Sequence, residues 1–248
     1  MDEKYFLKAS SIPYFFQECF AEYCTEKNIA AFDIDKNGLV WVIAGMNIEF
    51  APTGMPHWKD EITVKVWASE FKKTRIFTDF EMFCGERRFA KGDGCWFILD
   101  MNTRRPVPVS VLPETFPENP ERVFSERKKI EVDDISEQIG SISCEMHLSD
   151  LDFNMHVNNN SYIKHMLETF PEEFIAQTEL SSMSVKFIKE SFLHDILRFT
   201  TFSTKNGFYT TAQNAAGEKV FEAQTARRAK TNFERADFSD LNIPGRQK

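Results

Sequence analysis

The stretch SDLDFNMHVNNNSYIKHMLETFP, residues 149–171, decides what this chain is expected to form. Polar residues alternate with apolar ones in its first half, before a helical pattern begins: Asp150, Asp152, Asn154, His156 and Asn158. Three structures are compatible with such a pattern. They are a metal-binding loop, the solvated edge of a strand, and a catalytic segment in front of a helix.

A metal-binding loop fits this stretch poorly. The first acidic residues match the start of a calcium loop, but such a loop needs glycine at its sixth position and glutamate at its twelfth. Met155 and Ser161 occupy those two positions. The two histidines, His156 and His165, are nine residues apart, which does not match a zinc-type pair. We therefore predict no metal and no cofactor.

The strand-edge interpretation places Asp152, Asn154 and His156 on one solvated face, with their apolar neighbours pointing inward. The catalytic interpretation rests on the position of the same three residues just before the start of a helix. The asparagine run 158–160 can cap that helix. Free N–H groups at a helix start can hold an oxyanion, and an imidazole can transfer protons. An imidazole, an amide and an oxyanion site together suit acyl transfer to water. The residues alone leave both interpretations open.

Composition limits the class of protein. The chain has 248 residues, enough for one large domain or two small ones, and a net charge of −8, which argues against nucleic acid as main partner. Five cysteines without a CxxC spacing fit reduced thiols in a cytosol. No apolar run approaches the ~18 residues of a membrane span. The N-terminus MDEKYFLKASSIP has no signal-peptide core, so we expect a cytoplasmic location.

The same order of elements is expected twice along the chain. The first set is a helix capped by Ser10 or Ser11 and ending near Asn28, then strands at 39–50, 61–71, 74–83 and 94–101. The second set is a strand at 141–152, a helix from about Asn160 to Thr169, and strands at 183–191, 195–206, 208–217 and 219–229. Between the sets, five of the ten prolines lie within 106–120, followed by the charged stretch 121–134. That composition indicates a linker on the surface.

A faint likeness between the two halves supports a duplication. NIEF…HWKDEI (47–62) and SVKFIKESFLHDI (184–196) each run from a strand through a break to His and Asp before the next strand. One helix followed by antiparallel strands, twice, predicts an α+β protein in which curved sheets wrap the helices. We expect an N-terminal repeat at 1–105, a linker at 106–130 and a C-terminal repeat at 131–248.

Three segments resemble one enzyme family. DLDFNMHVNNNSYIKHMLE (150–168) resembles the D-x-N-x-H-V-N-N-x-x-Y signature of the fatty acyl-acyl carrier protein (acyl-ACP) thioesterases. CWFILDMNTRRPVPV (95–109) resembles their W-x-x-x-D/N-x-x-T-R-R element, and LSSMSVKFIKES (180–191) resembles the segment of their catalytic glutamate. The resemblance is to a bacterial-type member that is similar to the plant enzymes. It implies a double hot-dog fold, in which two tandem repeats each wrap a helix in a curved sheet.

The resemblance implies catalytic roles for Asp152, Asn154, His156 and Glu190. Asn154 would hold or polarise the reacting group, while Glu190 and His156 would activate water and then protonate the departing thiol. Asp152 would orient this network or attack as a nucleophile, and the sequence leaves that choice open. Ser191 stands where plant members have cysteine, so we do not expect a papain-like cysteine mechanism.

The resemblance also implies the partner: acyl carrier protein bearing a fatty acyl-phosphopantetheine. We expect no membrane span and no nucleic acid; the oligomeric state is open, with a homodimer as one option. Side chains of the first half that are candidates for an apolar acyl tunnel, or else for plain core, are Trp41, Met46, Phe50 and Trp67. Three rivals stay open: an acyl-CoA thioesterase of the same fold, a hot-dog dehydratase, and a catalytically silent acyl-binding or carrier-docking protein.

Overall fold

The computed structural model describes residues 5–52, 54–114, 116–117, 119–131 and 134–229. The ends of the two predicted repeats, residues 1–4 and 230–248, therefore lie outside the described residues. The first half contains α1 (Ile12–Glu26), α2 (Ala31–Asp35), β1 (Leu39–Phe50), β2 (Ile62–Lys72), β3 (Arg75–Cys84), β4 (Arg87–Asp100) and the short β5 (Arg105–Val107). The second half contains β6 (Gln138–Glu145), α3 (Asn159–Leu167), α4 (Glu172–Gln177), β7 (Thr178–Phe187), β8 (Ile196–Thr204), β9 (Gly207–Gln213) and β10 (Lys219–Ala229).

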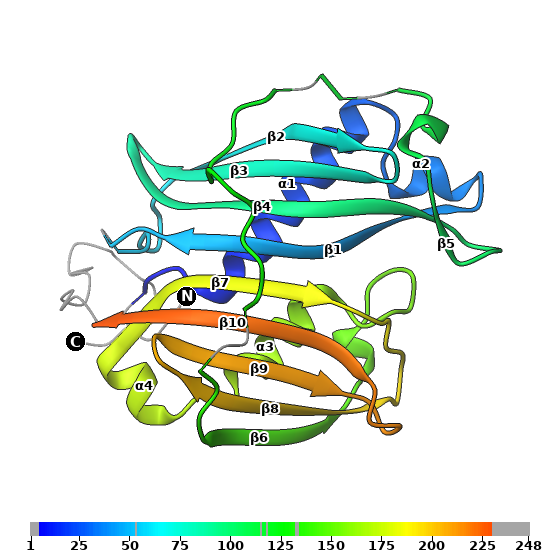
Figure 1. Cartoon of the computed structure of the whole chain (residues 1–248). Coiled ribbons are helices and arrows are strands. Elements are labelled where there is room, and N and C mark those ends of the chain that lie inside the picture. Colours follow the sequence, from blue (N-terminus) through cyan, green and yellow to red (C-terminus); the bar gives the residue numbers. More distant parts are fainter. Residues whose placement is uncertain (1–4, 53, 115, 118, 132–133, 230–248) are drawn as a thin grey trace, which may run out of the picture.

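The described strands form one antiparallel sheet with the order β2-β3-β4-β1-β7-β10-β9-β8-β6, and β5 pairs with β4. Both main helices lie behind this sheet in Figure 1, α1 against the first half and α3 against the second. The predicted α+β class and the double hot-dog arrangement are therefore confirmed.

Strands β1 and β7 join the two halves along their edges. They pair in antiparallel register from Gly45 opposite Lys186 to Glu49 opposite Ser182. The register of β1 against β4 shifts beside Gly45. A Cβ atom at Gly45 would lie 2.4 Å from the carbonyl oxygen of Val185. Glycine is required at this point because the backbone of β7 approaches too closely for a side chain.

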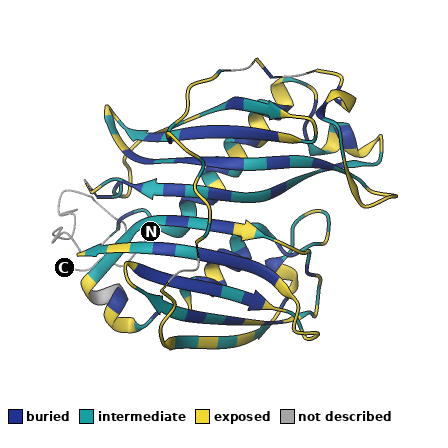
Figure 2. Ribbon diagram, viewed as in Figure 1, coloured by how far each residue is buried: buried dark blue, intermediate teal, exposed yellow. Residues whose placement is uncertain are grey.

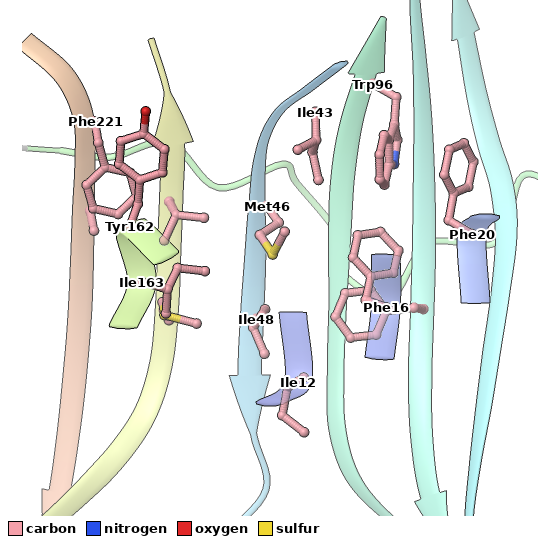
Figure 3. Packing of buried hydrophobic residues seen from close by; sticks show 14 of the residues in the cluster. Ile12, Phe16, Phe20, Ile43, Met46, Ile48, Trp96, Tyr162, Ile163 and Phe221 are labelled. Atoms are coloured by element: carbon pink, nitrogen blue, oxygen red, sulfur yellow. The ribbon is translucent and has the colours of Figure 1, made fainter. Parts of the chain in front are cut away.

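Helix α1 forms because apolar residues recur along one face and Pro13 stands in its first turn. Phe16 stacks on Phe80 of β3 with ring centroids 4.2 Å apart, and Phe20 stacks on Trp96 of β4 at 4.1 Å. These rings are buried and fill the space between helix and sheet (Figure 3). The expected side-chain cap is wrong: Ser11 is the N-cap residue, but its side chain makes no capping hydrogen bond.

Helix α3 packs in the second half as α1 does in the first. Tyr162 and Ile163 are buried, and the Tyr162 ring stacks on Phe221 of β10 at 5.5 Å (Figure 3). Buried residues run along the middle of the strands in both halves, as Figure 2 shows. Each fully buried side chain of this size contributes about 1.5–3 kcal/mol by its removal from water.

The faint likeness between the halves corresponds to one repeated turn. In HWKD the backbone N–H of His57 donates to Asp60 Oδ2 over 2.8 Å, and in FLHD the N–H of Phe192 donates to Asp195 Oδ2 over 2.8 Å. The third residue of each turn has a positive φ, 78° at Lys59 and 67° at His194. The two turns occupy equivalent places, between β1 and β2 and between β7 and β8.

The segment between the halves crosses the face of the sheet opposite the helices, as the green trace in Figure 1 shows. It is better anchored than its composition suggests. Phe116 and Phe124 are buried, and Arg127 reaches Glu70, Ser69 and Asp93 by hydrogen bonds of 3.2–3.3 Å. Because one sheet runs through both halves, the boundaries 1–105, 106–130 and 131–248 stay a prediction.

The prediction of a strand at 141–152 is wrong for the residues after Glu145. The strand expected at 141–152 ends at Glu145 as β6, and the residues after it turn back on themselves. Helix α4 was not expected. Among the described residues, no helix combines the length and the apolar character needed to cross a membrane.

Candidate active site

Asp152 organises the turn that carries three of the four predicted site residues. Its Oδ1 atom accepts the backbone N–H of Asn154 over 2.8 Å and that of His156 over 3.2 Å. The N–H of Asp152 donates to the carbonyl oxygen of His156 over 2.8 Å, which closes the turn. Phe153 and Met155 are therefore exposed, by 75% and 53%, rather than facing inward. The strand-edge interpretation of this segment is wrong.

Helix α3 begins directly after this turn, and most of its first N–H groups already have partners. The Asn158 side chain caps the helix, as predicted, by accepting the N–H of Asn160 over 2.8 Å. The N–H of Asn158 donates to Asp150 and that of Ser161 to the Asn158 carbonyl. Within the described part of the chain, no partner is found for the N–H of Asn159. This group lies at the site and is available to an anion.

Glu190 arrives from the loop after β7, not from a strand as predicted. The N–H of Val157 donates to the carbonyl oxygen of Ser191 over 2.9 Å, and His156 forms an isolated antiparallel β-bridge with Phe192. This contact brings Glu190 Oε1 to 3.9 Å from His156 Nδ1. The predicted acid/base pair is therefore assembled from two distant segments.

Arg104 completes the site from the first half of the chain. It lies in the turn after β4, and its guanidinium Nη2 forms an ion pair and hydrogen bond with Glu190 Oε2. The T-R-R element of the sequence contains Arg104, but nothing in that element indicated a contact with Glu190. Only the folded arrangement brings the two residues together.

The electrostatic environment lowers the pKa of His156 below the ordinary value for histidine. Partial burial is the main cause, since it disfavours the charged ring, and the Arg104 cation acts in the same direction. The Asp152 carboxylate opposes this effect without cancelling it. The imidazole of His156 is consequently a neutral group near pH 7, able to accept a proton.

A cavity of about 740 Å³ opens at this site. All four predicted residues line it, together with Arg104. It extends between the two halves to apolar side chains on α1, β1 and β4: Phe20, Ala21, Cys24, Val40, Trp41, Ile43, Trp96 and Leu99. Of the side chains suggested for an acyl tunnel, Trp41 lines the cavity. Met46 and Phe50 are buried in the core, and Trp67 donates to the Glu121 carbonyl.

Ser191 does not face this cavity. It is 1% exposed and is absent from the cavity lining, although Glu190 before it and Phe192 after it are present. Its neighbour in the interior is Tyr162, whose pKa burial raises to about 12. Among the described residues, neither hydroxyl has a hydrogen-bond partner of good geometry. A buried hydroxyl without an adjacent base is not an activated nucleophile.

Asp150 and His165 form a buried pair next to the turn that carries the site. Asp150 accepts the backbone N–H of His147, and its Oδ1 lies 3.4 Å from His165 Nε2. Burial alone would raise the pKa of Asp150. The His147 N–H and the nearby His165 ring outweigh burial and hold this pKa below its usual value. The Asp150 carbonyl accepts a hydrogen bond from the Ser161 hydroxyl, so Asp150 connects the turn to α3.

No group of three potential metal-ligating side chains occurs among the residues the structure describes, and the predicted absence of metal stays a prediction.

The five cysteines are unpaired, as predicted for reduced thiols. Cys24 lines the cavity, and burial raises the pKa of its thiol far above the ordinary value. Burial also raises the pKa of Cys144 to about 11. Neither thiol is therefore poised as a nucleophile.

Two family models match the chain, and both describe one family. The model for the acyl-ACP thioesterase N-terminal domain matches residues 16–117, and that for the acyl-ACP thioesterase C-terminal domain matches residues 135–235. Together they take in most of the chain.

Relatives with established names are similar over much of the chain. A chloroplastic palmitoyl-acyl carrier protein thioesterase from Arabidopsis thaliana is 29% identical over 178 residues, which are 68% of this chain and 42% of the relative. An oleoyl-acyl carrier protein thioesterase from the same plant is 27% identical over 201 residues, 74% of this chain and 55% of the relative. The chain spans about half the length of the curated relatives it matches.

Solved structures agree with the fold. An acyl-ACP thioesterase from Bacteroides thetaiotaomicron has a TM-score of 0.79 at 18% identity, covering 92% of this chain and 93% of that one. A 12:0-ACP thioesterase from Umbellularia californica has a TM-score of 0.78 at 18% identity, covering 93% of each chain. At this level of identity, the likeness establishes the arrangement of the backbone.

Proposed function

The chain belongs to the acyl-ACP thioesterase family, and on that premise we propose that it hydrolyses the thioester of fatty acyl-acyl carrier protein to release a free fatty acid. One observation carries the proposal. Asp152, Asn154, His156 and Glu190 all line one cavity, and most of the other side chains that line it are apolar. A polar reaction centre joined to an apolar chamber suits a substrate with a reactive head and a fatty tail.

The proposed reaction begins with water. His156 takes a proton from a water molecule as its oxygen attacks the thioester carbonyl carbon, and the carbonyl becomes an oxyanion. The N–H of Asn159 and the side-chain amide of Asn154 stabilise that oxyanion. The carbon–sulfur bond then breaks, the electron pair leaves with sulfur, and the proton held by His156 passes to the thiolate.

Glu190 acts beside His156 in this scheme. The 3.9 Å between Nδ1 and Oε1 is too long for a direct hydrogen bond, and it suits two groups that contact the same water. The low pKa of His156 supports its role as the initial base. Asp152 is assigned as the residue that orients the turn, because its Oδ1 atom is already engaged by two backbone N–H groups.

The fatty chain is proposed to lie in the part of the cavity formed by α1, β1 and β4. Phe20, Trp41 and Trp96 provide large apolar surfaces there. The first half would then bind the acyl chain while the second half carries the reacting groups.

The proposed partner is acyl carrier protein bearing a fatty acyl-phosphopantetheine, and cytoplasm is the proposed location. With a net charge of −8, the chain must meet an acidic carrier through a local basic area. The sequence has the adjacent basic pairs Arg87/Arg88, Lys128/Lys129 and Arg227/Arg228. One member of each already forms an ion pair: Arg88 with Glu81, Lys128 with Glu49, and Arg228 with Glu179. The docking residues and the homodimer option stay open.

The test is an assay of the full chain with acyl-carrier protein, following free thiol and identifying the product by mass. Release of free fatty acid and carrier thiol supports the proposal, and His156→Ala should lower the rate of release at least about 100-fold. Loss of water from a 3-hydroxyacyl carrier without thiol release would indicate a dehydratase. Binding without any product would indicate a silent acyl-binding protein.

A further inference from the structure

We propose that Arg104 is a positioning residue, supplied by the first half of the chain, that holds the Glu190 carboxylate in the reaction centre of the second half. The kinetic part of this inference rests on the proposed function. The geometric part rests on the turn that carries Arg104 and on the contacts of Glu190.

The turn after β4 is built to present Arg104. Asp100 Oδ1 accepts the backbone N–H groups of Asn102 and Thr103 over 3.0 and 2.7 Å, and the Thr103 hydroxyl over 3.0 Å. The N–H of Arg104 donates to the Asp100 carbonyl over 2.8 Å. Arg104 itself has a φ of 55°, a conformation that residues other than glycine rarely adopt. These contacts fix the backbone from which the Arg104 side chain reaches Glu190.

Glu190 depends on this contact for its placement. It lies in a loop, and among the described residues Arg104 is the sole hydrogen-bond donor to its carboxylate. Two other cations are near in sequence, but neither replaces Arg104. Lys189 pairs with Glu218, and Arg105 is exposed. A guanidinium group fixes a carboxylate in direction as well as in distance, which a lone ammonium does not.

Arg104 also acts on His156. The charged groups that face the His156 ring are Asp152 from its own turn, Glu190 from the loop after β7 and Arg104 from the turn after β4. The Arg104 cation disfavours protonation of the ring. One residue from the first half therefore orients the acid/base partner and adds to burial in disfavouring the charged form of the imidazole. A surface ion pair with no role in the site would do neither.

The experiment compares Arg104→Gln with Arg104→Lys and with the matched control Arg105→Gln. Steady-state rates are measured with acyl-carrier protein from pH 5 to 8. The His156 ring is followed by NMR titration without substrate, with its signal assigned from His156→Gln. Melting temperatures verify that each variant is folded.

We expect Arg104→Gln to lower kcat about 100-fold, as a displaced catalytic group does, while KM changes little. We expect the titration midpoint of His156 to rise in Arg104→Gln, to stay in Arg104→Lys, and to be unchanged in Arg105→Gln. Normal kcat in Arg104→Gln, a fall in kcat with an unmoved midpoint, or equal effects in Arg105→Gln would each overturn the inference. If the wild-type chain releases no thiol, the proposed function fails, while the NMR titration still tests the effect of Arg104 on His156.

Discussion

His156 Nδ1 lies 3.9 Å from Glu190 Oε1, although one residue stands before α3 and the other after β7. The contact between the Val157 N–H and the Ser191 carbonyl brings the two segments together, and Asp152 fixes the turn that carries His156. Backbone contacts thus bring the two segments together, and the Arg104 side chain pairs with the Glu190 carboxylate. Asp152, Asn154, His156 and Glu190 all line the cavity, where a substrate can reach them.

We predict that His156→Ala and Glu190→Ala each lower kcat by at least about 100-fold, the usual effect of removing a general acid or base. The matched control is His194→Ala, because His194 also contacts a glutamate, Glu145, but on the exposed surface. Steady-state kinetics and thermal melts provide the comparison. Near-normal turnover in either site variant would refute the assigned roles.

Ser191→Ala is predicted to change kcat by less than about threefold. The Ser191 hydroxyl is buried, faces away from the cavity and lacks a hydrogen-bond partner of good geometry among the described residues, so its removal should change the melting temperature little. The same assay and a thermal melt measure both effects. A loss as large as that of Glu190→Ala would revive a covalent mechanism through residue 191.

The source of the new oxygen atom distinguishes the two roles left open for Asp152. In a single turnover in H₂¹⁸O, direct attack by water places ¹⁸O in the first fatty acid released, which is the result we predict. If the carboxylate attacked and displaced the thiolate, and water then opened the resulting anhydride at the aspartyl carbonyl, that product would carry ¹⁶O from Asp152 instead. Mass spectrometry of the acid gives the answer. Asp152→Asn should keep part of the activity, because its amide oxygen can still accept the N–H groups of Asn154 and His156.

The pH dependence of kcat/KM follows from the lowered pKa of His156. The ring must be neutral to accept a proton, so activity should rise with pH through the pKa of the free enzyme. We predict that this acid limb has its midpoint below about 6.5, the ordinary value for histidine. A midpoint above that value would mean that the ring is stabilised in its charged form, contrary to the environment described here.

Much of the fold could be predicted from the sequence because its signals are local. Alternating apolar residues located the strands, and the three asparagines located the start of α3 within one residue. The likeness of the turns HWKD and FLHD pointed to the duplication because both depend on an aspartate three residues after the N–H it accepts. Such signals require no knowledge of the tertiary structure.

The errors have physical reasons. Residues 151–157 alternate as a strand would, but Asp152 competes for the backbone N–H groups and bends the segment into a turn. Proline content predicted a linker on the surface, but not its anchors: Phe116 packs against Phe20 and Tyr23 of α1, and Arg127 donates to Glu70 of β2. Arg104 was missed for a similar reason, since its partner lies in the other half of the chain.

Hydrolysis of acyl-carrier protein is tested by measuring kcat/KM for free-thiol release from that substrate beside the matched acyl-CoA and a short neutral thioester. We predict that the carrier substrate is preferred over acyl-CoA. Raising salt should lower its kcat/KM more than that of the neutral thioester, because exposed charges are screened beyond about 8–10 Å at 0.1–0.15 M. Equal efficiency on acyl-CoA without a salt-sensitive preference, or no thiol release from the carrier, would contradict the assignment of acyl-carrier protein as the substrate.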